Sequence, residues 1–436
     1  MKEPQSSLFN KQDSSNPVDH NPAKFNRKPI TAATAQQKVA DYVRLIDTET
    51  ISLYTAGGRF LAEDVQAPHP YPHFRRSGMD GYAVIASDIA QASSDHMIWL
   101  QVIDNIPCGQ TPSVPLIQGT AARIMTGAMV PDEADTVVML EMTESRQAEG
   151  KEWVGLKRSV EQGRNITPIG LEIQAGDMLL TKGAQIGAGE ISVLATFGVH
   201  EVEVYRRPQV AIFSTGTELL SVEQPIEPGK IRNSNSYMLA EQVKAAGGEP
   251  HVLGAIMDDL ELARTTMLQA LSSYDIVISS GGVSVGDYDV MGDLVRSDEV
   301  EMLFNKISMR PGSVTTGAVK DGKLLFALSG NPGACFVGCE LLVRPTIRQM
   351  MNSKHDYLPE WTATLGHDYH KINSFTRYVR GSIAVEEGKI VAYPASLDES
   401  SVMVTIKDSD CLIVIPPTSE VLPAGTTVSV LRLSRS

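Results

Sequence analysis

The sequence is poor in cysteine, in positive charge relative to negative charge, and in long apolar runs. Its four cysteines form no CxxC pair, which argues against a zinc or disulfide framework and suits a reducing compartment. The formal net charge of −14 argues against a protein that grips nucleic acid by its phosphates. No stretch reaches the about 18 apolar residues that a membrane span needs. We therefore expect a cytoplasmic protein that binds neither nucleic acid nor membrane.

The chain also lacks the common signatures of nucleotide and hydrolytic sites. GxxxxGK[ST] and GxGxxG are absent, which excludes the usual phosphate loop and the dinucleotide fingerprint. HExxH is absent too, which argues against a zinc protease site. A site for an anionic ligand therefore has to be built in another way.

The 436 residues are too many for one core, and their pattern changes along the chain. Residues 1–30 are rich in Ser, Asn, Gln and Pro, and we expect them to be disordered and to hold no secretory signal. Apolar spacing predicts a helix over 34–53 and another near 189–197. Short apolar runs separated by turns predict a β-rich part over 97–143.

From residue 208 onward, nearly all-apolar strands alternate with helical patterns. This alternation predicts a doubly wound, mostly parallel sheet that is covered by helices on both faces. Asn331 and Pro332 are expected to open a long helix, which Pro345 would kink or divide. After about residue 356 only strand patterns remain, and these predict a small C-terminal β-barrel.

Three loops of similar composition follow strands of the predicted sheet. They are STGTEL at 214–219, SSGGVSVGDYD at 279–289 and LSGNPGA at 328–334. Ligands of parallel α/β sheets bind beyond the carboxyl ends of the strands, where glycine-rich turns expose amides to anions. A single such loop is often only a tight turn, but three at one edge predict a site for a phosphorylated anion. The candidate binding residues are Ser214, Gly216, Ser280, Gly281, Gly282, Ser284, Gly286, Ser329, Gly330, Asn331 and Pro332.

Charged side chains lie in or near the same loops. The acids are Glu218, Asp258, Asp259, Asp287 and Asp289. Mg²⁺ prefers one or two carboxylates together with phosphate oxygens, although acids before a helix also act as simple caps. Lys306 and Arg310 are four residues apart, which places them on one face of a strand. They are candidates for binding an oxyanion, or are ordinary surface charges.

Seven stretches of the chain carry a family resemblance. They are RRSGMDGYAV (75–84), RIMTGAMVPDEADTVVMLE (123–141), IFSTGTEL (212–219), IRNSNSYML (231–239), SSGGVSVGDYD (279–289), RPGSVTTG (310–317) and LSGNPGACF (328–336). Together and in this order they resemble the molybdopterin molybdenumtransferases of the MoeA type, which are similar to the E domain of gephyrin. The resemblance covers about residues 34–436.

The resemblance implies a multidomain α/β and β architecture and a homodimer. The implied parts are a tail at 1–30, a split N-terminal domain at 31–66 and 164–206, a β-rich insertion at 67–163, an α/β domain at 207–352 and a barrel at 353–436. It places the active site between the α/β domain of one subunit and the first two domains of the other. Molybdopterin adenylyltransferase and molybdoenzyme chaperones are implied as further candidate partners.

The implied reaction takes adenylylated molybdopterin and molybdate, uses Mg²⁺, and releases AMP as molybdenum cofactor forms. The implied Mg²⁺ ligands are Glu218, Asp258 and Asp289. The catalytic residues are these three with Asp80, Lys306 and Arg310. Beyond the loop residues, the implied ligand-binding set adds Thr126, Arg380 and Ser400, and Arg310, Ser329, Arg380 and Ser400 would bind molybdate.

The chain departs from the commoner family motifs at several positions. KPGKP is RPGSV here, so that Ser313 replaces a lysine, and PGNPVS is SGNPGA. STGDEL is STGTEL, which keeps Glu218 and places Thr217 where an acid is usual. A Gln-Gly-Ser run of the barrel reads Asp398-Glu399-Ser400. We interpret these differences as variation within the family.

Two other functions fit parts of the sequence. A molybdopterin adenylyltransferase has a similar α/β unit, but would need neither the barrel nor the segment with MDGYA. An inactive molybdopterin-binding scaffold is the second alternative. The presence of Asp80, Glu218, Asp289 and Lys306 argues against such a loss of activity.

Overall fold

The computed structural model describes residues 28–256, 260–281, 294 and 299–433 of the chain. The chain divides into two compact units. The first contains the chain up to Leu45, Arg207–Met350 and His355–Ser436, and the second contains Ile46–Arg206 and Met351–Lys354. The predicted α/β fold with a terminal barrel is confirmed in the first unit. The finer five-part division stays a prediction.

A six-stranded sheet forms the centre of the first unit, in the order β16-β13-β17-β21-β20-β18. Its strands are β13 (Gln209–Thr215), β16 (Glu249–Ile256), β17 (Ile276–Ser280), β18 (Glu301–Phe304), β20 (Thr316–Lys320) and β21 (Lys323–Leu328). The first four in spatial order are parallel, whereas β20 and β18 add antiparallel pairs. The prediction of a mostly parallel sheet is therefore confirmed.

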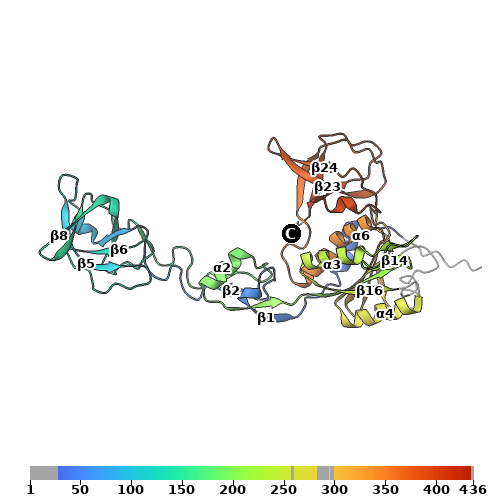
Figure 1. Cartoon of the computed structure of the whole chain (residues 1–436), viewed down its shortest axis with the longest axis horizontal. Helices are drawn as coiled ribbons and strands as arrows, with labels where there is room; N and C mark the ends of the chain where they lie inside the picture. Colours follow the sequence, from blue (N-terminus) through green and yellow to red (C-terminus); the bar gives the residue numbers. More distant parts are fainter. Residues whose placement is uncertain (1–27, 257–259, 282–293, 295–298, 434–436) are drawn as a thin grey trace, which may run out of the picture. The chain divides into compact units, whose positions relative to one another are not determined.

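Helices cover both faces of this sheet, as predicted. α4 (Leu260–Ser273) packs on β17 and β21, and its buried Met267 belongs to one apolar cluster with Phe213 of β13. α3 (Asn235–Ala246) contacts β13 and β16, and α6 (Pro332–Gly338) contacts β21. Figure 1 shows α3 and α6 on the side of the sheet opposite α4. Burial on both faces explains why the strands are almost entirely apolar.

The long helix after β21 begins and is interrupted where the sequence predicts. It comprises α6, a π-helical segment (Cys339–Val343) and α7 (Arg344–Met350). Asn331 is the N-cap residue, although its side chain makes no capping hydrogen bond. Pro345 has no N–H to donate to the carbonyl of Leu341, four residues earlier. That carbonyl instead accepts from the Gln36 side chain at 2.8 Å, which satisfies it without the helical bond.

The helix predicted at 34–53 is wrong beyond its first part. α1 spans Ala32–Ala40, and the Thr31 hydroxyl caps it by accepting from the backbone N–H three residues on. The chain then forms β1 (Thr48–Ser52), which pairs antiparallel with β12 (Glu201–Tyr205). Thr and Ile are β-branched and fit a paired strand better than a helix, so the long-range partner overrides the apolar spacing.

The C-terminal part of the first unit is a closed five-stranded barrel. Its strands are β22 (Glu360–Leu365), β23 (Thr376–Glu386), β24 (Lys389–Pro394), β25 (Cys411–Ile415) and β26 (Thr427–Arg432). They follow the order β23-β24-β22-β26-β25, and pairing of β25 with β23 closes the ring. A short strand β19 (Met309–Arg310) runs parallel to the beginning of β23 and joins the barrel to the α/β part.

The second unit is rich in β-structure, as predicted. Its six-stranded sheet has the order β7-β4-β6-β5-β9-β8. These strands are β4 (Gly81–Val84), β5 (Ile98–Ile106), β6 (Thr120–Ile124), β7 (Thr136–Met139), β8 (Thr143–Ala148) and β9 (Lys151–Leu156). The shorter strands are β2 (Val65–Gln66), β3 (Arg76–Ser77), β10 (Ile166–Thr167) and β11 (Met178–Leu180). The helix predicted near 189–197 is α2 (Ala188–Thr196).

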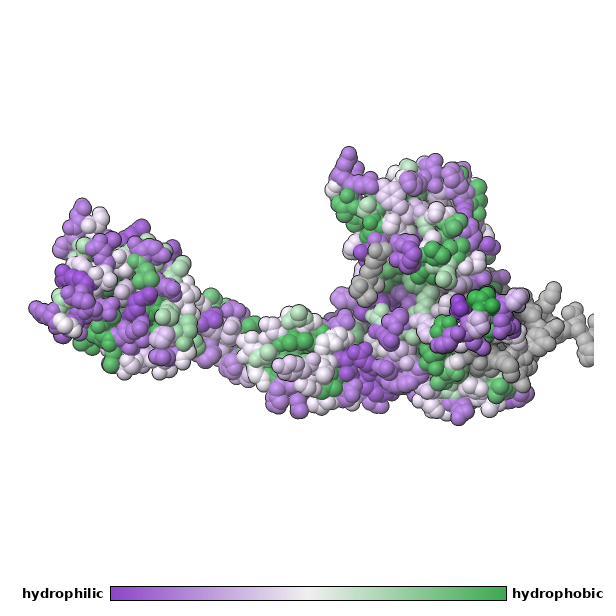
Figure 2. Space-filling view, in the orientation of Figure 1, coloured by the Kyte–Doolittle hydropathy of each residue, from purple (hydrophilic) through white to green (hydrophobic). Residues whose placement is uncertain are grey.

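The surface agrees with the composition. On the face shown in Figure 2, hydrophilic residues cover much of both units and apolar residues lie in small separate groups. None of the helices in the described part of the chain combines the length and hydropathy that crossing a bilayer requires.

Candidate functional site

The described first residues of the three predicted loops meet at one edge of the central sheet. β13, β17 and β21 are parallel neighbours, and their registers pair Ser214 with Ser280 and Ser280 with Leu328. The strands therefore end at the same level, and the first residues of the loops that follow them lie side by side. They enclose a cavity of about 1040 Å³ with residues of the barrel. This geometry was predicted from the sequence alone.

Nine of the predicted site residues line this cavity. They are Ser214, Gly216, Glu218, Ser280, Gly281, Ser329, Gly330, Asn331 and Pro332. Barrel residues Ser401 and Met403 complete the wall. Gly282, Ser284, Gly286, Asp258, Asp259, Asp287 and Asp289 lie outside the described residues. The ligand-binding role of all these residues stays a prediction.

Gly281 is required by the way the loops pack. Its φ of +91° is unfavourable for a residue with a side chain. A Cβ atom there would also lie 2.6 Å from the carbonyl oxygen of Thr215, the last residue of β13. The Gly281 N–H donates to the carbonyl of Leu328, the last residue of β21, at 3.1 Å. This glycine therefore allows close approach to the neighbouring strand ends, in addition to any approach of a ligand.

The beginning of α3 ties the three loops together. Asn235, which is 8% exposed, donates from Nδ2 to the Ser280 hydroxyl at 2.7 Å and to the Gly330 carbonyl at 2.8 Å. The Ser214 hydroxyl lies 2.8 Å from the hydroxyl of Ser236 and donates to Oδ1 of Asn233 at 3.0 Å. One helix start thus bonds to the ends of β13 and β17 and to the loop after β21.

This α3 polar cluster (Asn233, Asn235 and Ser236) was missed in the sequence analysis. The residues belong to the IRNSNSYML stretch, which there served only as part of the resemblance. The hydroxyls of Ser214 and Ser280 are buried in this cluster and hold the loops in place. The sequence does hold a sign of this cluster. Three polar residues lie at the start of one helix, and a helix cap needs only one of them.

Glu218 is the one carboxylate among the described residues that line the cavity. It follows the strand end Thr215, and its carbonyl accepts from the Ile231 N–H at 2.9 Å. This bond extends the short parallel pair of β14 (Leu219–Leu220) and β15 (Ile231–Arg232). Within the described ranges, no three His, Cys, Asp or Glu residues cluster closely enough to hold a metal ion. A single carboxylate with ligand oxygens fits Mg²⁺, which often takes few protein ligands.

The barrel covers the amides at the start of α6. The Ser400 carbonyl accepts from the N–H groups of Gly333 at 2.9 Å and Ala334 at 3.3 Å. Arg380 is 1% exposed and donates to the carbonyls of Glu399 at 2.8 Å and of Val402. Burial lowers the pKa of this guanidinium, which nevertheless stays charged. The helix start therefore faces a barrel carbonyl.

Lys306 and Arg310 do not share one strand, so that part of the prediction is wrong. β18 ends at Phe304, and the chain turns before Arg310 enters β19 beside the barrel. Arg310 is exposed, and its guanidinium carbon lies 5.8 Å from the centre of the Phe375 ring. Arg310, Lys306, Arg380 and Ser400 are not among the residues that line the cavity.

The second unit brings together Asp80 and Thr126, two predicted site residues that are 46 positions apart. Oδ1 of Asp80 accepts from the backbone N–H of Thr126 at 2.6 Å and from its hydroxyl at 2.8 Å. These two bonds, with the charge of Arg123, lower the pKa of Asp80. Arg123 also donates to the Gly81 carbonyl at 2.9 Å, which holds the loop beside β4.

Family models match three consecutive regions of the chain. Residues 30–198 match the MoeA N-terminal region (domain I and II), residues 211–349 match a probable molybdopterin binding domain, and residues 362–433 match the MoeA C-terminal region (domain IV). The first region covers α1 and most of the second unit, and the other two correspond to the α/β part and the barrel.

Curated relatives and solved structures cover nearly the whole chain. A molybdopterin molybdenumtransferase of Bacillus subtilis is 43% identical over 93% of this chain and 94% of its own length. One from Staphylococcus epidermidis is 39% identical, with 93% and 96% covered. A crystal structure of the molybdopterin biosynthesis MoeA protein from Pyrococcus horikoshii superposes with a TM-score of 0.80 at 28% identity, covering 93% of this chain and all of that one.

The fold, the cavity and these matches define a multidomain enzyme of the transferase class. The relatives match end to end, so no large part of either chain lies outside the comparison. The chain belongs to the MoeA family of molybdopterin molybdenumtransferases.

Proposed function

We propose that the protein inserts molybdenum from molybdate into adenylylated molybdopterin, with Mg²⁺, and releases AMP. The observation that carries this proposal is that the described residues of three glycine-rich loops, Glu218 among them, line one cavity at the carboxyl edge of a parallel sheet. This edge is where α/β sheets bind ligands, and its loops suit a phosphorylated anion.

The cavity lining is of two kinds, polar main chain and apolar side chains, which suits a ligand with polar and apolar parts. Gly281 and Gly330 contribute main chain. Ile226, Ile231 and Met403 contribute apolar side chains, and each of them is more than half exposed. The volume of about 1040 Å³ is at the upper end of that found for small-molecule sites. A nucleotide-sized ligand with a ring system fits these dimensions.

In this proposal Mg²⁺, when bound, balances the charge of the phosphoanhydride as that bond is cleaved. Glu218 would hold the ion, and Asp258 and Asp289 remain its proposed further ligands. The described residues fit the ion, because a carboxylate and phosphate oxygens are the donors that Mg²⁺ prefers. The residues of this chain then position the adenylate so that AMP can leave.

Arg310 remains the proposed cation for molybdate, with Lys306, Ser329, Arg380 and Ser400. Guanidinium groups suit an oxyanion because they donate two parallel hydrogen bonds. Arg380 already donates to two backbone carbonyls, so it has to release one of them before it can bind molybdate through both NH₂ groups. Of this set, Arg310 is the guanidinium exposed to solvent.

We also propose that the active protein is a cytoplasmic homodimer, as the family resemblance implies. Asp80 and Thr126 are the residues that the second unit would contribute to catalysis. The mass of the purified protein, measured by light scattering, tests the dimer. A monomer that is fully active would remove it from the proposal.

The reaction is tested with pure protein, adenylylated molybdopterin, molybdate and Mg²⁺. AMP release with molybdenum retained on the pterin supports the proposal. Tight binding of the substrate without turnover favours a molybdopterin-binding scaffold. Formation of the adenylate from ATP and molybdopterin favours an adenylyltransferase.

A further inference from the structure

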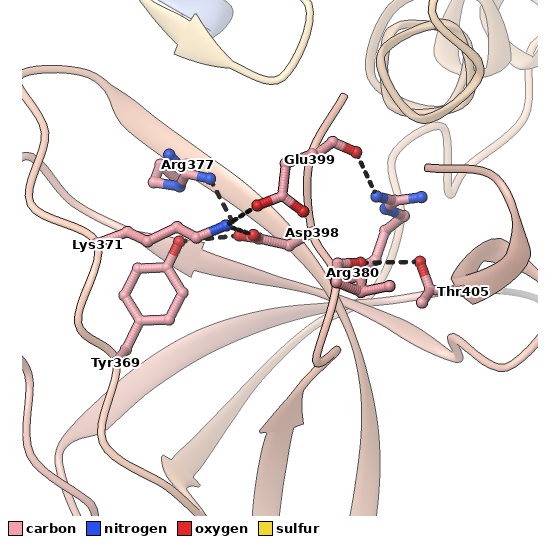
Figure 3. A network of polar contacts seen from close by, with 8 residues as sticks. Tyr369, Lys371, Arg377, Arg380, Asp398, Glu399 and Thr405 are labelled. Atoms are coloured by element: carbon pink, nitrogen blue, oxygen red, sulfur yellow. Dashed lines mark hydrogen bonds and ion pairs between the residues drawn. The ribbon is translucent and has the colours of Figure 1, made fainter. Parts of the chain in front are cut away.

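An ion cluster in the barrel lies at one end of the segment that forms the barrel side of the cavity. Asp398 is 6% exposed, and its carboxylate accepts from Tyr369 at 3.1 Å, from Arg377 at 3.0 Å and from Lys371 (Figure 3). Lys371 also bonds to the Glu399 carboxylate at 2.9 Å and lowers its pKa. The cations come from β23 and from the loop before it, so they are carried by the barrel frame.

The segment that follows Asp398 has no regular secondary structure. Residues 399–403 form a turn, and Arg380 holds the turn through the carbonyls of Glu399 (Figure 3) and of Val402. The Ser400 carbonyl accepts from two amides of α6. Ser401 and Met403, at the far side of this turn, line the cavity. The shape of this wall therefore depends on the contacts of the Arg380 side chain and on the hydrogen bonds of the Ser400 carbonyl, and not on strand pairing.

Because the Asp398 carboxylate is buried, it has to stay beside the partners that donate to it. A buried carboxylate is costly unless its partners remain, so the segment cannot move away from Arg377 and Lys371 without leaving an uncompensated charge. Three donors from two parts of the barrel also restrict the direction of the carboxylate. The chain leaving Asp398 is consequently held at a fixed place and angle.

We propose that Asp398, with Lys371 and Arg377, is a positioning cluster that sets the barrel wall of the cavity and thereby the affinity for the molybdopterin substrate. The proposal rests on the proposed function for the identity of that substrate. It assigns no contact between Asp398 and the substrate. Its effect is transmitted through the main chain of residues 399–403 to Ser401 and Met403.

The test compares two aspartates of the same barrel. Asp398→Asn removes the charge at the cavity segment. Asp410→Asn removes a paired carboxylate charge at another place in the barrel. Asp410 pairs with Arg432 at 3.2 Å and does not line the cavity. Turnover is measured with adenylylated molybdopterin, molybdate and Mg²⁺. We expect Asp398→Asn to raise the KM for adenylylated molybdopterin by about tenfold or more and to change kcat by less than about twofold. Asp410→Asn should leave both constants unchanged. Equal effects of the two variants on KM would overturn the proposal.

Lys371→Met provides a second variant if Asp398→Asn does not fold. Lys371 is 40% exposed, so its loss is milder, and it is expected to raise KM in the same direction. Hydrogen exchange of residues 399–403, measured without substrate, separates this proposal from the proposed function. Faster exchange in Lys371→Met but not in Asp410→Asn supports the positioning role even if the wild-type protein shows no transferase activity. Unchanged exchange together with unchanged KM rejects it.

Discussion

Asn235 on α3 donates a hydrogen bond of 2.8 Å to the carbonyl of Gly330, 95 residues further along the chain. The same amide group donates to Ser280 at the end of β17. Through these two bonds one buried side chain sets the spacing of two of the loops that line the cavity. A similar contact between Ser236 and Ser214 holds the third loop.

Asn235→Ala is expected to lower the free energy of unfolding by about 1–3 kcal/mol, because it leaves a buried carbonyl and hydroxyl without this donor. It should also lower kcat/KM by about tenfold or more, since the loops would no longer keep their spacing. Turnover and thermal unfolding are measured together.

Gln242→Leu is the matched control for Asn235→Ala. Gln242 lies on the same helix, is also 8% exposed, and donates to the Phe336 carbonyl and to Glu340. It does not line the cavity. If both variants lose stability and activity to the same degree, the special role of Asn235 in loop spacing is rejected.

Gly281→Ala is expected to cost about 1–3 kcal/mol of stability from backbone strain, and more from its contact with Thr215. Activity should fall as the loops separate.

Gly388→Ala serves as the control for Gly281→Ala, because Gly388 has a φ of +78° with nothing within 4 Å of an added Cβ. Gly388 lies in the turn between β23 and β24, so this variant should lose stability from strain alone and keep its kcat/KM. Full activity in Gly281→Ala would contradict this account.

Thr126→Val is expected to raise the pKa of Asp80 towards its ordinary value of about 3.9, because it removes the hydroxyl donor. A lowered pKa contributes stability that is complete above the unfolded-state value and is lost as pH falls through the folded-state value. The variant should therefore lose this contribution at a higher pH than the wild type. Carbon NMR of protein labelled at the aspartate carboxyl groups follows the titration. Identical Asp80 titrations in the two proteins would show that the Thr126 hydroxyl has no such effect.

Glu218→Gln is expected to raise the Mg²⁺ concentration needed for half-maximal activity by about tenfold, since one charged oxygen donor to the ion is lost. Glu223→Gln, five residues further on and outside the cavity lining, controls for the loss of charge. Removal of metal by a chelator should abolish turnover in all three proteins. Equal Mg²⁺ requirements in Glu218→Gln and the wild type would exclude Glu218 from metal binding.

Periodicity and composition were sufficient for the main elements of the first unit. The alternation expected from residue 208 onward starts with β13 at Gln209, and Pro332 begins α6 as expected. The start and end of these elements depend on local features, namely apolar runs, proline and capping residues. The local sequence is therefore enough to predict them. The second half of the helix expected at 34–53 failed because β1 depends on a partner strand about 150 residues away.

By itself, the sequence determined the parallel sheet, the terminal barrel and the meeting of Gly281, Gly330 and Glu218 at one edge, because parallel strands end on the same side. Tertiary structure alone decided which hydrogen-bond partners the polar groups at that edge have. Ser214 and Ser280 bond to α3, and the amides at the start of α6 bond to Ser400. Hydrogen bonds between residues far apart in sequence leave no periodic trace, so only the folded arrangement shows which donors are already used.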